Sequence, residues 1–117
     1  NKVIYDSNGI KVTYTGLSVN NFGEININLN IENNTDKNYT FQVSDFSLND
    51  IMFEPIFSCD VVSGKKAVDG IYLPLWSLND IGISKAEEIE NVEFSLHIFN
   101  SKDWNDAIDT EKVSINF

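Results

Sequence analysis

Residues 24–32 read Glu-Ile-Asn-Ile-Asn-Leu-Asn-Ile-Glu, and this stretch decides the fold class. Apolar residues occupy every second position, with asparagine between them. Because side chains on a β-strand point alternately to opposite faces, the pattern gives one apolar face and one polar face. A helix with this sequence would scatter the same isoleucines around its axis. The stretch therefore predicts a β-strand whose inward face consists of Ile25, Ile27, Leu29 and Ile31.

Further segments have strand character and are separated by short polar turns. Val92–Ile98 repeats the alternation, and Tyr39–Leu48 does so with a shift that predicts a bulge near Ser44-Asp45. Because proline cannot donate a hydrogen bond to a neighbouring strand, the segment around Pro55 is expected at a sheet edge or broken there, and Pro74 also predicts an edge. The predicted strands are 3–6, 10–19, 24–32, 39–48, 51–62, 71–76, 92–98 and 113–117.

The segments between these strands are predicted to be loops or single helical turns. Ser63–Lys66, Asp69-Gly70 and Asn100–Asp109 are polar and are expected to connect strands. Ser77 and Ser84 each precede an acidic residue by three positions, a spacing that favours a capped helix start. Neither can begin a long helix, so the pattern predicts an all-β sandwich or barrel.

Charge and cysteine content exclude several functions. The 117 residues carry 18 acidic and 8 basic side chains, for a net charge of −10, and every basic residue is a lysine. Nucleic acids and anionic lipids both require neutralising cations, so we expect no nucleic-acid binding. No apolar run is long enough for direct membrane insertion. Cys59 is the only cysteine, which leaves no internal disulfide and predicts a buried core thiol.

Two segments resemble immunoglobulin-like domains of uncharacterised Gram-positive lipoproteins and membrane-anchored surface proteins. They are Cys59–Ala67 (Cys-Asp-Val-Val-Ser-Gly-Lys-Lys-Ala) and Ile89–Trp104, in which a strand leads into an Asp- and Ser-rich turn with a tryptophan. The resemblance implies an immunoglobulin-like antiparallel β-sandwich of seven to eight strands with one or two short helical turns. It also implies an extracellular, envelope-associated location. The length of the chain predicts that residues 1–117 form a single domain, and its start at Asn1 beside a predicted strand suggests a fragment of a longer protein. No catalytic residues are carried over.

Two sets of polar residues are candidates for a metal site or for catalysis. Asp103, Asp106 and Asp109 recur at every third position and suggest calcium, although a solvated acidic turn is the favoured interpretation. His97 is the only histidine, and the alternation of its strand places it on the outward face. Nothing in the sequence selects a nucleophile or an orienting acid for it. We therefore expect no enzyme and no cofactor.

The aromatic residues Tyr72, Trp76, Phe99 and Trp104 offer a possible platform for a sugar or peptide, although core or rim packing is the favoured interpretation. The function expected is a non-enzymatic interaction or spacer module that contacts another protein through loops or through the edge strands near Pro55 or Pro74. The alternative is a carbohydrate-binding module using exposed Trp76 and Trp104. That alternative requires both rings to lie exposed on one surface.

Overall fold

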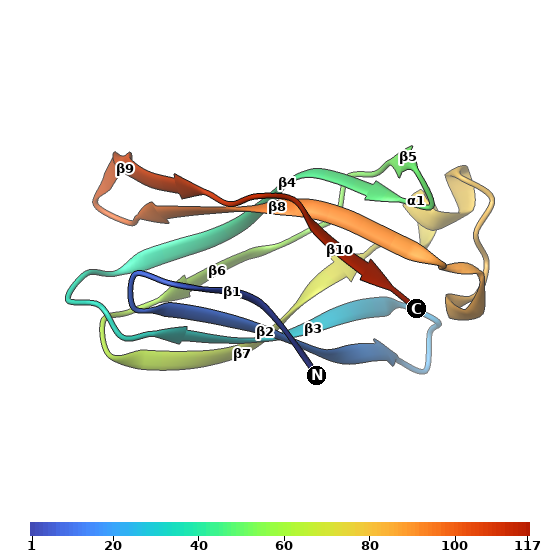
Figure 1. Ribbon diagram of the computed structural model, residues 1–117. Helices are drawn as coiled ribbons and strands as arrows, with labels where there is room; N and C mark the ends of the chain where they lie inside the picture. The colour runs from blue at the N-terminus through green and yellow to red at the C-terminus, as the bar shows by residue number, and fades with distance from the viewer.

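Two antiparallel β-sheets form the two layers of the computed structural model, which describes residues 1–117 (Figure 1). The first sheet has the order β1-β2-β3-β7, with β1 (Lys2–Ser7), β2 (Ile10–Val19), β3 (Ile25–Asn33) and β7 (Lys65–Leu73). The second has the order β10-β8-β4-β5, with β10 (Val113–Asn116), β8 (Asn91–Asn100), β4 (Tyr39–Leu48) and β5 (Ile51–Met52). In the second sheet, β6 (Ser58–Val61) also pairs with β4, and β9 (Asp103–Asp109) pairs with β8.

The space between the sheets holds a core of 24 buried hydrophobic residues. The four predicted inward residues of β3 are at most 1% exposed, and those of β8, from Val92 to Ile98, are all at 0%. The alternation predicted for both strands is therefore confirmed. Burying a side chain of this size contributes about 1.5–3 kcal/mol, so the inward rows of β3 and β8 supply a large part of the core between the layers.

The second sheet confirms two expected irregularities. The register between β4 and β8 shifts between Ser44 and Ser47, and Asp45 has a φ of 52°, which locates the predicted bulge. The predicted strand 51–62 is broken around Pro55, leaving β5 and β6, both paired with β4. This break and the unexpected strand β9 raise the number of strands to ten, instead of the seven to eight expected.

Three predicted loops lie wholly or partly in strands. Ser63-Gly64 form a turn as predicted, but β7 begins at Lys65 and pairs without interruption with β3, so Asp69-Gly70 belong to a strand and Asp69 lies opposite Leu29. Asn100–Asp109 was expected to be a polar connection, but Asp103–Asp109 forms β9. In both places backbone pairing with a long neighbouring strand outweighs the low strand propensity of Asp, Asn and Gly.

The helical segments are short and begin elsewhere than expected. Helix α1 (Leu75–Asp80) follows Pro74 instead of starting at Ser77, so the predicted strand 71–76 ends at Leu73. A 3₁₀ turn, η1 (Ala86–Glu88), follows Ser84, but the acid that closes it is Glu88. The Glu88 carboxylate accepts hydrogen bonds from the Ser84 hydroxyl (2.8 Å) and the Lys85 amide (3.1 Å). No helix has the length and apolar character needed to cross a membrane.

Candidate functional site

A shallow hollow of about 310 Å³ lies on the outer face of the second sheet. It is lined by Gln42 of β4, His97 and Phe99 of β8, and Trp104 of β9. In the register, Gln42 lies opposite His97, while the neighbouring Phe41 and Ile98 lie opposite each other and point into the core. Gln42 and His97 therefore point outward into the hollow. The outward position of His97 was predicted from the sequence.

An irregularity in the β8–β9 pairing positions Trp104. Phe99 lies opposite Ala107 and Asn100 lies opposite Asp103, so residues 104–106 of β9 have no counterparts on β8. A bulge of this kind redirects side chains. The Trp104 ring stands edge-on to Phe99, with 6.4 Å between ring centroids, and is 78% exposed. Phe99 in turn contacts His97 at 5.3 Å, which makes a row of three rings.

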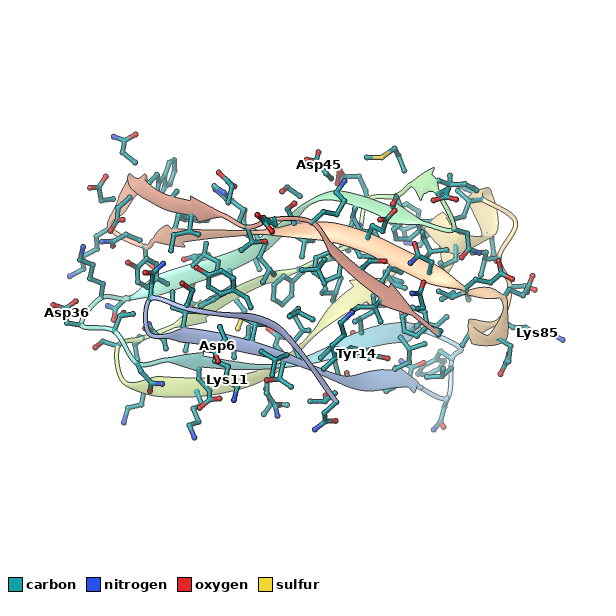
Figure 2. All side chains as sticks on the ribbon, in the orientation of Figure 1. Asp6, Lys11, Tyr14, Asp36, Asp45 and Lys85 are labelled. Carbon is teal, nitrogen blue, oxygen red and sulfur yellow. The ribbon has the colours of Figure 1, made fainter.

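Polar contacts fix the bulged part of β9 to its surroundings. The Asp106 carboxylate is 3.3 Å from the Lys37 ammonium, in the turn between β3 and β4, and accepts a hydrogen bond of 3.3 Å from the Asn100 amide. The hydrogen bond to Asp106 and its negative charge raise the pKa of Lys37. These contacts hold the β8–β9 hairpin against the end of the molecule marked by Asp36 in Figure 2.

The Asp109 carboxylate lies beside His97, at one end of the row of rings. The His97 Nδ1 atom lies 2.6 Å from the Asp109 Oδ1 atom, and Asp109 is opposite His97 in the β8–β9 register. The Asp109 carboxylate is 70% exposed, and its second oxygen has no hydrogen-bond partner. The hollow thus combines exposed aromatic surface with the Gln42 amide and an imidazole, and the open carboxylate of Asp109 lies next to that imidazole.

The outer faces of the two sheets differ in charge. On the first sheet Asp6, Lys11, Glu32 and Lys66 lie opposite one another across β1, β2, β3 and β7, so negative and positive charges alternate. Lys66 and Glu32 form an ion pair of 3.5 Å. This face is balanced in charge.

The outer face of the second sheet is acidic. Asp60, Glu93 and Asp109 occupy outward positions on β6, β8 and β9, and none of the strands of this sheet contains a lysine. Asp45, at the bulge of β4, also projects from this side (Figure 2). The nearest lysine in sequence to Trp104 is Lys102, in the β8–β9 turn. The face that carries the hollow is therefore the one with an excess of negative charge.

The three aspartates considered for calcium are not gathered into one site. Asp106 is held by Lys37 and Asn100, Asp109 by His97, and Asp103 accepts a hydrogen bond from the Asn105 amide. No group of three or more His, Cys, Asp or Glu side chains is placed to hold a metal ion. Because Asp106 lies within the bulge of β9, its carboxylate has different neighbours from those of Asp103 and Asp109.

The structure does not bring together the residues considered for an aromatic platform. Trp104 lies on β9, and Trp76 lies on α1 at the opposite end of the molecule, with an exposed ring (68%) (Figure 1). The Tyr72 hydroxyl donates to the Glu24 carboxylate on the first sheet. Of the four aromatic residues, only Trp104 and Phe99 are in contact. Gln42 was not foreseen, because its place beside them depends on the β4–β8 register.

The sheet edges expected to contact a partner are joined to each other at one point. Ile56, in the segment after Pro55, and Tyr72 of β7 exchange two backbone hydrogen bonds of 2.9 Å. This bridge closes the side of the sandwich between β6 and β7. The edges near Pro55 and Pro74 therefore present less free backbone for strand addition than open edges would.

Cys59 points into the core, as predicted, and is 8% exposed. Burial, together with a hydrogen bond to Asp69 and the charges of Asp69 and Asp60, raises the pKa of its thiol to about 12. Since the thiolate is the reactive species, this environment suppresses nucleophilic chemistry.

We therefore expect iodoacetamide at pH 8 to alkylate Cys59 in the folded protein on the order of a hundredfold or more slowly than in the unfolded chain. Mass spectrometry of quenched time points measures both rates, the second in guanidinium chloride. Equal rates in the two states would show that the thiol is neither buried nor held protonated.

Comparison with protein-family models, with curated proteins and with solved structures finds no match for this chain.

Proposed function

We propose that the chain is a non-enzymatic interaction module of a bacterial envelope protein, with an immunoglobulin-like sandwich that binds through the outer face of its second sheet. The observation that carries this proposal is the exposed Trp104 ring set against Phe99 in a hollow. Exposing an indole to water is unfavourable, and tryptophan is among the residues most enriched at binding hot spots. The rings of Phe22 and Trp76 are exposed as well, but only Trp104 lines a hollow with a second aromatic ring beside it.

The strand order supports the immunoglobulin-like assignment. In that fold one sheet holds strands A, B and E, and the other holds C, F and G. Here β2, β3 and β7 are neighbours in one sheet, while β4, β8 and the β9/β10 edge are neighbours in the other, with β6 beside β4. The chain differs from antibody domains in having a single cysteine, so no disulfide links the sheets.

The extracellular, envelope-associated location rests on resemblance alone. Cys59–Ala67 and Ile89–Trp104 resemble segments of Gram-positive lipoproteins and anchored surface proteins. The second segment includes the strand and the turn that carry His97, Phe99 and Trp104. The resemblance and the hollow therefore point to the same part of the chain.

Carbohydrate binding is the second candidate, and the mixed character of the hollow favours it. An aromatic ring can stack on a sugar ring while Gln42 and Asp109 hydrogen-bond hydroxyl groups. This version uses Trp104 and Phe99, because Trp76 lies at the other end of the molecule.

Binding to isolated Gram-positive cell envelopes tests the proposal. We expect the purified domain to co-sediment with envelopes, and Trp104→Ala to weaken this binding by about thirtyfold, the loss that marks an interface hot spot. Trp76→Ala is the matched control, because it removes another largely exposed tryptophan ring outside the hollow, and it should bind as the wild type does. Equal binding by Trp104→Ala and wild type would contradict the proposed site. No binding by any form would favour a spacer.

A further inference from the structure

We propose that the hollow binds an arginine side chain presented by a basic segment of a partner protein. This inference rests on the proposed function and names the partner's chemistry. It is drawn from the row of rings formed by Trp104, Phe99 and His97 and from the charge of the face on which they lie.

The rings suit a guanidinium group with an apolar stem. Guanidinium is planar and weakly hydrated, and it stacks on aromatic faces, with tryptophan the best partner for a cation. The methylene groups of arginine can cover apolar surface while the charged end remains in contact with polar groups. A hollow of about 310 Å³ lined by Gln42, His97, Phe99 and Trp104 is large enough for one such side chain.

The carboxylate beside the rings supplies the counter-charge. One oxygen of Asp109 is taken by His97 and the other is free, in a side chain that is 70% exposed. A guanidinium N–H can donate to that free oxygen in a charge-assisted hydrogen bond. Asp60 and Glu93 on the same outer face add negative charge that no lysine of these strands offsets.

The charge and composition of the chain favour a positively charged ligand that comes from a different protein. The net charge is −10, so a basic segment is attracted to the domain and an anionic one is repelled. All eight basic residues here are lysines, so a second copy of this chain cannot supply an arginine. A neutral sugar would leave the acidic face uncompensated. Charge complementarity therefore favours an arginine-bearing partner.

Titrating the isotope-labelled domain with three short peptides tests the inference. The first carries two arginines spaced by glycine, the second has citrulline in their place, and the third has lysine. Citrulline keeps the shape of arginine without its charge. We expect the arginine peptide to shift the Trp104 indole N–H resonance and leave that of Trp76 unmoved. The citrulline peptide should bind at least tenfold more weakly, and the lysine peptide should lie between them.

Two substitutions in the domain complete the test. Trp104→Ala should weaken binding of the arginine peptide by about five- to thirtyfold, as expected when a cation–π contact is lost. Asp109→Asn should weaken it several-fold, with the difference from wild type shrinking as salt is raised. Trp76→Ala should bind unchanged.

The outcomes separate this inference from the proposed function. Equal binding of the arginine and citrulline peptides, or no response from Trp104, overturns the inference. If methyl glycosides shift the Trp104 resonance and the arginine peptide does not, the hollow is a sugar site and the interaction module survives. If envelopes bind in a Trp104-dependent way but no peptide does, the proposed function stands with another ligand.

Discussion

Replacing Phe94 with alanine should lower the free energy of unfolding by about 3–5 kcal/mol, because it removes a large buried ring and leaves a cavity. Phe94 is 0% exposed and sits on the inward face of β8. Its ring stacks on Phe46, with 5.6 Å between centroids and 16° between planes, so the substitution also deprives Phe46 of its neighbour. A loss of this size is a large part of the 5–15 kcal/mol that stabilises a typical domain.

Urea unfolding followed by far-UV circular dichroism measures the effect, since both tryptophans are exposed and report poorly on the core. Phe22→Ala is the matched control, because Phe22 is 80% exposed in the β2–β3 turn and its removal should change stability by less than about 0.5 kcal/mol. A loss below about 1 kcal/mol for Phe94→Ala would mean that the inward face of β8 is not packed in the core.

Strands buried on one face could be predicted from the sequence because their pattern is imposed by the core. In β3 and β8 every second residue must be apolar, so Ile25–Ile31 and Val92–Ile98 carry the information locally. Pro55 was equally informative, because a missing N–H is a property of one residue. Such features need no knowledge of which strands become neighbours.

The edges could not be predicted in this way. β7 starts with Lys65-Lys66 and contains Asp69-Gly70, and β9 contains four polar residues among its seven, yet both are strands. An edge strand is held by backbone hydrogen bonds to one neighbour, and its side chains are free to be polar. Only the presence of a long partner, β3 or β8, determines that such a segment is extended.

The candidate site was predicted in part for a similar reason. The outward position of His97 followed from the alternation of inward and outward residues along β8. Trp104 was recognisable as an aromatic residue in a polar segment. Its contact with Phe99 depends on the bulge of β9, and the approach of Gln42 depends on the β4–β8 register. Trp76 and Trp104 looked equivalent because spacing along the chain does not say at which end of a sandwich a residue lies.

Asn33 gives the second large expected effect, since replacing it with leucine should destabilise the fold by about 2–4 kcal/mol. The predicted strand ended at residue 32, but Asn33 is the last residue of β3 and is 0% exposed. Its amide nitrogen donates to the carbonyl oxygens of Lys37 (2.9 Å) and Val61 (2.8 Å). Its amide oxygen accepts from the Thr35 amide (3.1 Å) and hydroxyl (2.6 Å). Leucine has the same branched skeleton, but its two methyl groups cannot form hydrogen bonds, so the substitution would leave buried polar groups unpaired.

Asn33→Asp keeps the size of the side chain but changes its hydrogen bonding, so it separates the contribution of the hydrogen bonds from that of packing. A carboxylate would face the carbonyl oxygens of Lys37 and Val61, so in the folded state the introduced group should bind a proton more tightly than in the unfolded chain. Its unfavourable contribution to stability should therefore shrink as the pH falls from 7 toward 4. Urea unfolding at several pH values measures this difference from wild type, with Asn34→Ala, at an exposed neighbour, as the control. A constant difference across that range would mean that the side chain at position 33 is solvated, and the junction of β3, β4 and β6 would then need another explanation.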